Sequence, residues 1–238
     1  MKCAFNVGMA LLLAWLTNST GAAEGGVPTV EALVKRLPAT ETAVRLFNGK
    51  DLSGWDGAPG IWSVDGDAIK GANTTPVATS TYLFTRESYR NFRLLFEVKQ
   101  TMSPQHSTMH SAVGALGERF TDKGGNEHGF RGPLLMFCHD WGIWDAYRRN
   151  RVVPVGAGPK AEKKGDWNLV EILVTGNRIQ FAVNGVQVFD FTDKPEMLKE
   201  SPLGLQIHSN AKPQEYRFRG LVLSKNPGDK LVTVAAGK

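Results

Sequence analysis

Cysteine is scarce in this 238-residue sequence, which contains only Cys3 and Cys138. A fold held together by several disulfides is therefore excluded. Internal repeats, coiled-coil heptads and low-complexity tracts are also missing from the sequence. It has no G-x-S-x-G, Walker or Rossmann motif and no H-x-H or H-E-x-x-H spacing. The sequence therefore contains no short motif that indicates a nucleophile elbow, a nucleotide-binding site or a zinc site.

Long hydrophobic runs are absent too, apart from the ten residues Val7–Leu16. This run is too short for a transmembrane helix, which needs about 20 apolar residues. Lys2 precedes the run, small residues follow it up to Ala23, and no lipid-attachment cysteine comes after it. This is the arrangement of a secretory leader. We expect residues 1–23 to be a signal peptide and the mature protein to be periplasmic or secreted, with no membrane partner.

Removal of such a leader would take Cys3 away and leave Cys138 with no intrachain disulfide partner. Cys138 then has two interpretations, a reactive thiol or a small buried side chain. It ends the apolar run LLMFC, residues 134–138, and this favours the buried side chain.

A large excess of charge of one sign is also lacking, because the formal net charge is +5 and the sequence pI is about 9.2. Nucleic-acid binding and an ordinary solvated surface are both compatible with a mildly basic chain. The Lys and Arg residues are scattered along the sequence, which favours the solvated surface. We therefore expect no nucleic-acid partner, and the oligomeric state stays open.

What the sequence does contain is clearest between Trp167 and Phe191. Three apolar, β-branched runs are separated there by Gly176-Asn177 and Asn184-Gly185. Asn-Gly between alternating apolar residues is the strongest short hairpin signal. The segment predicts a three-stranded antiparallel meander, and its spacing is typical of a β-sandwich or barrel.

The rest of the chain predicts further strands at 61–68, 69–71, 79–84, 91–101, 109–116, 133–137, 203–209 and 215–223. They predict one all-β domain over residues 43–224. Before it we expect an arm, residues 24–42, with a short helix that ends before Pro38. Residues 118–132 are polar and glycine-rich and predict a long loop, and residues 225–238 predict a frayed tail.

Two of these strands carry polar side chains opposite an apolar face. Between Leu203 and His208, the residues Gln206 and His208 point away from the apolar face. Both are therefore candidate site residues on an outer, concave surface, or else an ordinary polar surface pair. In the strand 91–101, Glu97 lies opposite the apolar face. Glu97 either lines the same surface or pairs with a Lys or Arg on a neighbouring strand.

A third group of candidates lies in the segment 138–151, which reads CHDWGIWDAYRRNR. Aromatic rings can stack on sugars, and Arg and Asp can bind vicinal hydroxyls, so this mixture suits a carbohydrate site better than a solvated loop. The candidates in the segment are His139, Asp140, Trp141, Asp145, Tyr147, Arg148, Arg149 and Arg151.

The order of several motifs resembles the 3-keto-disaccharide hydrolase domain family. The matching stretches are LFNGKDLSGW, W-x-V-x-D-G from Trp62, NFRLLFEVK, HSA from His110, GDWNLVEILVTGNRIQFAVNG, LGLQIHSN and EYRFRGLVL. Together they span about residues 44–223. The resemblance implies a two-sheet antiparallel jelly-roll sandwich, similar to concanavalin A and laminin G domains.

The resemblance also implies hydrolysis of a 3-keto-glycoside, in which a base removes the proton beside the ketone, the enolate expels the glycosidic oxygen and water adds back. For this reaction we select His208, Glu97 and His139 as catalytic candidates. The substrate-binding candidates are His110, Arg131, Asp140, Trp141, Asp145, Tyr147, Arg148, Arg149 and Gln206. The usual family pattern, G-x-E-x-Q-x-x-D, differs from the sequence here, GPLLMF from Gly132, where the first acid is Asp140.

Two alternatives stay open beside an enzyme: a non-catalytic carbohydrate-binding sandwich, and a protein-interaction domain with a flat apolar patch. No cofactor is assigned. His139 and Asp140 are adjacent and would point apart in a strand, which gives a weak metal signal. A divalent cation such as calcium, held by oxygen ligands, stays open.

Overall fold

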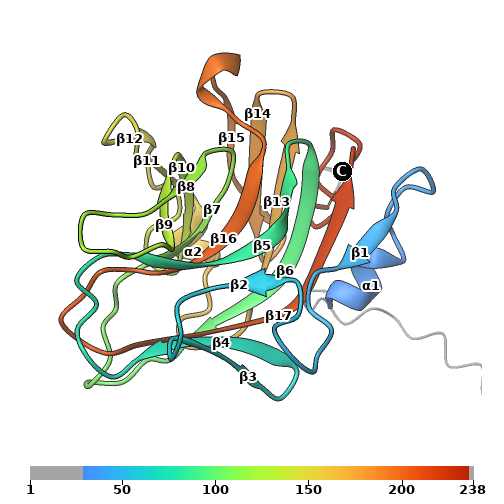
Figure 1. Ribbon diagram of the computed structural model, residues 1–238. Helices are drawn as coiled ribbons and strands as arrows, with labels where there is room; N and C mark the ends of the chain where they lie inside the picture. Colours follow the sequence, from blue (N-terminus) through green and yellow to red (C-terminus); the bar gives the residue numbers. More distant parts are fainter. Residues whose placement is uncertain (1–28, 236–238) are drawn as a thin grey trace, which may run out of the picture.

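The computed structural model describes residues 29–235, which form two antiparallel β-sheets packed face to face (Figure 1). The eight-stranded sheet has the order β15 (Val186–Thr192), β14 (Arg178–Val183), β13 (Asn168–Thr175), β6 (Phe92–Gln100), β17 (Gln214–Lys225), β4 (Ala68–Asn73) and β3 (Trp62–Asp65), with β1 (Ala43–Arg45) also paired to β17. The seven-stranded sheet has the order β12 (Asn150–Val153), β11 (Ile143–Asp145), β10 (Pro133–Phe137), β7 (Ser111–Gly114), β16 (Ser201–Ile207), β5 (Thr81–Tyr89) and β2 (Trp55–Asp56). The predicted fold class, an all-β two-sheet sandwich, is confirmed.

The core lies between the two sheets. Phe96 and Phe218 of the eight-stranded sheet meet Phe137 of the seven-stranded sheet, with ring centroids 5.8 and 6.0 Å from that of Phe137. The apolar residues that alternate along each strand supply this layer, because successive side chains point to opposite faces. Cys138 joins the same core, and burial raises the pKa of its thiol, as expected for a small buried side chain.

The meander is present as predicted, in β13, β14 and β15. Asn184 and Gly185 both have positive φ, 49° and 82°, as a type I′ turn requires. In the other turn, Gly176 has a φ of 61°, and Asn177 does not share the positive φ. The glycine alone therefore provides the left-handed backbone of that turn.

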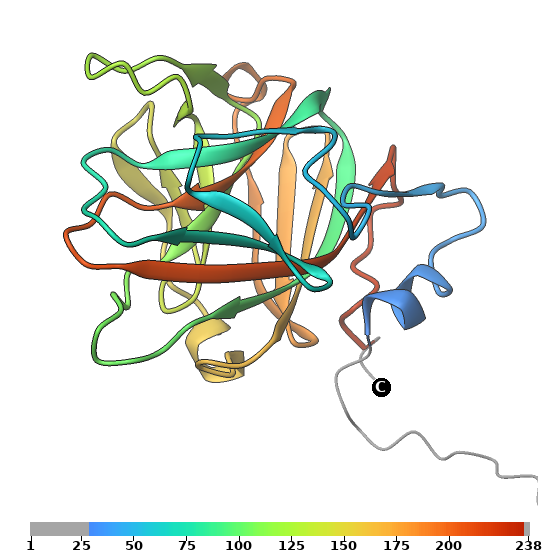
Figure 2. The same ribbon diagram turned by 60° about the horizontal axis from the view of Figure 1, so that its bottom comes forward.

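The outer face of the eight-stranded sheet is covered by both ends of the described chain (Figures 1 and 2). Helix α1 (Val30–Val34) buries Val30 and Leu33 against this face. The segment 226–235 lies beside it, where the backbone N–H of Thr233 donates to Glu171 at 2.8 Å. The prediction of a frayed tail is therefore wrong for residues 226–235. The signal peptide predicted over residues 1–23 lies outside the described residues.

Arg93 holds these segments together at one buried point. Its guanidinium bonds Glu41 at 2.9 and 3.0 Å, Glu171 of β13, and the carbonyl of Lys230 at 2.9 Å. Three stretches far apart in sequence thus meet at one buried cation.

The predicted loop 118–132 contains a small ribbon of two strands, β8 (Glu118–Phe120) and β9 (Gly129–Arg131). The remaining helical turns are α2 (Gly158–Ala161) and the 3-10 turn η1 (Pro195–Met197). Within residues 29–235, the structure has no helix with the length and hydropathy of a membrane span.

Candidate functional site

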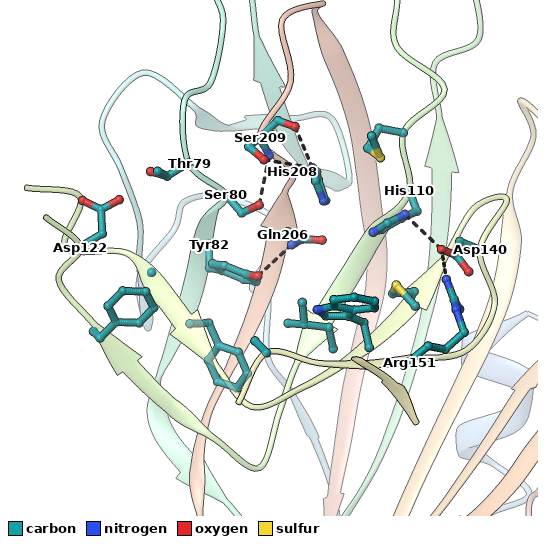
Figure 3. Close-up of a pocket in the computed structure, with 18 residues that line it drawn as sticks. Thr79, Ser80, Tyr82, His110, Asp122, Asp140, Arg151, Gln206, His208 and Ser209 are labelled. Carbon is teal, nitrogen blue, oxygen red and sulfur yellow. Dashed lines mark hydrogen bonds and ion pairs between the residues drawn. The ribbon is translucent and has the colours of Figure 1, made fainter. Parts of the chain in front are cut away.

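A pocket of about 580 Å³ is hollowed into the outer face of the seven-stranded sheet, beside the β8–β9 ribbon (Figure 3). One face of strand β16 borders the pocket. Leu205 and Ile207 point into the core, whereas Gln206 and His208, which follows the strand, point into the pocket. The residues around the pocket are Thr79, Ser80, Tyr82, Met109, His110, Phe120, Asp122, Gly129, Phe130, Leu134, Met136, Asp140, Trp144, Ala146, Arg151, Gln206, His208 and Ser209.

Two imidazoles meet in this pocket. The rings of His110 and His208 are 4.9 Å apart between centroids and nearly perpendicular, at 81°. Nδ1 of His208 lies 2.7 Å from the carbonyl oxygen of Ser209. Because a carbonyl only accepts, Nδ1 carries the proton, and Nε2 of the neutral ring keeps its lone pair. Nε2 of His208 can therefore accept a proton from a ligand in the pocket.

His110 is linked to an ion pair on the other side of the pocket (Figure 3). Its Nδ1 lies 3.5 Å from Oδ2 of Asp140, and the same oxygen accepts from Nη2 of Arg151 at 2.6 Å. Burial, reinforced by the nearby charges of His208 and Arg151 and opposed by Asp140, lowers the pKa of His110 to about 4. His110 is therefore neutral at pH 7 and can donate one proton and accept another.

Three polar oxygens beside the pocket have no hydrogen-bond partner in the described part of the chain. Gln206 donates its amide N–H to the Tyr82 hydroxyl at 2.8 Å, and burial raises the pKa of that phenol. Oε1 of Gln206, Oδ1 of Asp140 and Oδ2 of Asp122 are buried and have no partner among residues 29–235. Buried polar atoms are nearly always hydrogen-bonded, so these three oxygens are unsatisfied acceptors beside the pocket.

The floor of the pocket is apolar. Tyr82, Phe130, Leu134 and Met136 belong to a hydrophobic cluster that is separate from the core between the sheets. Trp144 of β11 lies opposite Leu134 in the strand register and is 38% exposed. Leu134 and Met136 occupy the positions where the family pattern has Glu and Gln, so the departure seen in the sequence falls inside the pocket.

Of the predicted substrate-binding residues, His110, Asp140 and Gln206 lie around this pocket, together with the catalytic candidate His208. Arg151, part of the aromatic and basic cluster, lies there too. These residues come from four separate parts of the chain, and the strand pairing brings them together.

Trp141, Asp145 and Arg148 do not line the pocket. Trp141 is in the core, where its indole N–H donates to Glu162 at 2.9 Å. Asp145 is fully buried and accepts from the backbone N–H groups of Tyr147 and Arg148 at 2.7 and 2.9 Å. The side chain of Arg148 bridges Asp145 and Asp193. The prediction that these three line the substrate site is corrected: Trp141 packs in the core, and Asp145 with Arg148 holds the turn after β11.

Four further predicted residues also lie outside the pocket. Tyr147 packs with Lys199, whose Nζ is 5.4 Å from the ring centroid. Arg149 is exposed in the turn, with a φ of 51°. Arg131 stacks over Phe120 at 4.2 Å, behind the pocket wall. His139, a catalytic candidate, has a positive φ of 75° that turns it toward Glu162, whose Oε2 accepts from its backbone N–H at 3.0 Å.

Glu97, the remaining catalytic candidate, is in the opposite sheet. It faces outward from β6 and accepts from Nε of Arg219 at 2.8 Å, and Arg219 is its cross-strand neighbour. The alternative of a cross-strand pair is therefore the one observed, and the proposed concave position is wrong.

The sequence interpretation missed Tyr82, Phe130 and Trp144. Trp144 sits between two buried residues, Ile143 and Asp145, so the alternation along β11 could have indicated its outward direction. Alternation along the strand did not single out Tyr82 or Phe130. Both lie in strands whose position beside the pocket depends on pairing with residues far away in the chain. No group of three or more His, Cys, Asp or Glu side chains within residues 29–235 is arranged to hold a metal ion.

The fold and the pocket together define a class: a jelly-roll sandwich with a ligand pocket on the outer face of one sheet. Residues 42–223 match the model of the 3-keto-alpha-glucoside-1,2-lyase-like domain, and the chain belongs to this family. The resemblance stated from the sequence is thereby confirmed. A separate comparison with curated proteins found no match.

Two solved structures illustrate the fold similarity. A protein from Parabacteroides distasonis ATCC 8503, named "putative glycosyl hydrolase", has a TM-score of 0.54 at 18% identity, over 76% of this chain and 98% of that one. A Bacillus subtilis protein of unknown function with a galectin-like fold has a TM-score of 0.57 at 10% identity, over 79% of this chain and 96% of that one. At these identities the similarity concerns the fold. The family match supports a carbohydrate-related function.

Proposed function

We propose that this protein cleaves a 3-keto-glycoside in the pocket on its seven-stranded sheet, by elimination followed by hydration. The observation that carries the proposal is His208 itself, whose Nδ1 faces the Ser209 carbonyl so that Nε2 is left for a ligand in the pocket, beside the imidazole of His110. A ketone at C3 acidifies the proton at C2, so one base near neutral pH is enough to start the reaction.

The elimination step assigns a role to each polar group. Nε2 of His208 removes the C2 proton, and the electron pair forms the enolate and breaks the C1–oxygen bond. The leaving oxygen takes the proton that His208 has just removed, so His208 returns to its neutral form, and the neutral His110 can hydrogen-bond the sugar beside it. Water then adds across the C1–C2 double bond and gives the free 3-keto sugar. Among the described residues around the pocket, Arg151 is the one permanent cation, and it is positioned to stabilise the enolate oxygen.

Gln206 and Asp140 would bind the sugar itself. Each has a buried oxygen with no partner in the described part of the chain, and a sugar hydroxyl can donate to it. The proposed reaction uses one carboxylate, Asp140, whereas the common glycosidase mechanism needs a pair. The second carboxylate around the pocket, Asp122, accepts from the backbone N–H groups of Gly124 and Asn126 and has no role in the proposed reaction.

The test is release of free sugar from a 3-keto-disaccharide, with the wild type and with His208→Ala. We expect turnover by the wild type and a loss of about 10²- to 10⁴-fold in kcat for the variant, the usual contribution of a general base. His139→Ala is the matched control. His139 faces Glu162 and lies outside the pocket, so this variant should keep the activity of the wild type. Equal turnover by the wild type and His208→Ala would contradict the proposed base.

A carbohydrate-binding module is the second candidate function, and the apolar Leu134 and Met136 in place of the family's Glu and Gln favour it. Sugar binding by the wild type with no turnover would decide for the module. A flat apolar patch, expected of a protein-interaction domain, does not describe this pocket, which has His110, His208, Asp140 and Arg151 around it.

We also propose that the protein acts outside the cytoplasm, on the strength of the leader pattern in residues 1–23. N-terminal sequencing of the mature protein should begin after Ala23. A mature chain that still carries residues 1–23 would contradict the proposal.

A further inference from the structure

The pocket is divided into a polar side and an apolar side, and the division follows the strand order. The polar groups His110, Gln206 and His208 belong to β7, β16 and the residues that flank them. On the other side, β10 and β11 contribute Leu134 and Trp144, and the Asp140–Arg151 ion pair lies at the border of this side.

The distance between the two sides exceeds one sugar ring. His208 follows β16, and Trp144 lies in β11, three strand positions away across β7 and β10. At about 4.8 Å per strand this is roughly 14 Å. A 3-keto sugar held at the two histidines would therefore leave the β10–β11 side to the group attached to C1. The whole pocket, about 580 Å³, is large enough to bury a ligand of that length.

The side chains on the β10–β11 side favour one kind of group attached to C1 of the sugar. Leu134, Met136, Ala146 and Trp144 have no oxygen among their side chains, and their one N–H is that of the indole. A second sugar placed there would find few partners for its hydroxyls. The Arg151 and Asp140 side chains nearby are paired with each other at 2.6 Å, and the proposed reaction uses both of them on the 3-keto sugar. An aromatic ring would instead stack on the exposed indole and bury its surface against Leu134 and Met136.

We propose that the β10–β11 side of the pocket is a subsite for an aromatic aglycone, so that the preferred ligands are aryl 3-keto-glycosides. This inference rests on the proposed function for the position of the sugar. It goes beyond that function by naming the group that leaves.

Isothermal titration of the full protein tests the subsite. The probes are 4-nitrophenyl 3-keto-α-glucoside, methyl 3-keto-α-glucoside and a 3-keto-disaccharide of glucose, at a temperature where turnover is slow. We expect the aryl glycoside to bind at least about tenfold tighter than either of the others. Trp144→Ala should remove this advantage and leave the affinity for the methyl glycoside unchanged. His208→Gln should weaken the aryl and methyl glycosides by the same factor.

Val186→Ala is the matched control, because Val186 is an equally exposed apolar side chain in the other sheet. It should change no affinity. Equal affinity of the wild type for aryl and methyl glycosides, or an equal loss for both in Trp144→Ala, would overturn the subsite, whether or not the glycosides are cleaved. Tight, Trp144-dependent binding of the aryl glycoside without cleavage would support the subsite and contradict the proposed catalysis. If neither glycoside binds, both proposals fail.

Discussion

The two aspartates of the segment 138–151 show how differently neighbouring residues of one type can be used. Asp140 keeps one oxygen for Arg151 and one buried oxygen without a partner in the described structure. Asp145 is fully buried and bonded to the backbone and side chain of Arg148. Asp140 therefore belongs to the site and Asp145 to the framework.

Alanine substitution should separate these two roles. Asp145→Ala leaves buried donors without an acceptor, so we expect it to lower the free energy of unfolding by about 3–5 kcal/mol, as for a broken buried ion pair. Asp140→Ala should cost much less stability and weaken sugar binding instead. Urea unfolding and titration with a 3-keto-glycoside measure the two effects. A stable Asp145→Ala variant with impaired sugar binding would contradict the assignment.

His110 makes the stability of the protein depend on pH. Its pKa falls to about 4 in the folded state, below the usual value of 6.5, so the unfolded chain binds more protons between these limits. The free energy of unfolding should therefore fall as the pH is lowered from about 6.5 to 4, by at most about 3 kcal/mol from this group.

Urea unfolding at several pH values between 7 and 4 measures this dependence. His110→Gln has no proton to bind and should show a flatter curve over the same range. The Val186→Ala variant changes no titratable group, so it is the control and should keep the slope of the wild type. Identical slopes for the wild type and His110→Gln would show that the burial of His110 does not have this effect.

At the scale of elements, both ends of the described chain cover the outer face of the eight-stranded sheet. Helix α1 and the segment 226–235 enclose a cluster that includes Leu95, Leu169 and Val222. Below them Arg93 bonds Glu41 and Glu171, and the segment 226–235 supplies further donors to Glu171. The last strand, β17, therefore does not end the folded domain.

Truncation tests this point. A chain that ends at Lys225 loses the N–H groups of Val232 and Thr233, which bond Glu171 at 2.8 to 3.0 Å, and exposes the apolar cluster. We expect a loss of stability of a few kcal/mol. A chain that ends at Ala235 is the control and should be as stable as the full protein. Thermal unfolding compares the three, and equal midpoints would refute the structural role of the segment.

At the scale of the whole molecule, the two sheets share one core. Phe96, Phe137 and Phe218 are in mutual contact across the interface. Neither sheet can bury its inner face alone, so the sandwich should unfold as one unit.

Phe137→Ala should lower the free energy of unfolding by about 3–5 kcal/mol, as usual for a buried phenylalanine. Far-ultraviolet circular dichroism and tryptophan fluorescence should still give coincident transitions, because the loss affects both sheets together. Val186→Ala, at an exposed position, should change stability by less than about 0.5 kcal/mol. Two separate transitions would show that the sheets are independent units.

The sequence by itself determined the longer strands, the meander and the outward direction of Gln206 and His208. These are local properties, because a period of two and an Asn-Gly turn depend on residues that are close in the chain. The family motifs lie in the same strands, so the family could also be predicted from the sequence. The sequence did not predict the short strands β1, β2, β11 and β12, and β8 and β9 fall in a predicted loop.

Only the tertiary structure decided which of the candidate residues share the pocket. The left-handed backbone at Cys138 and His139, with φ of 61° and 75°, interrupts the alternation, so it directs Trp141 inward and Asp140 outward. Glu97 has the correct alternation but lies in the opposite sheet. Alternation tells which face of a strand is polar, whereas the sheet to which that face belongs depends on pairing between strands far apart in the chain.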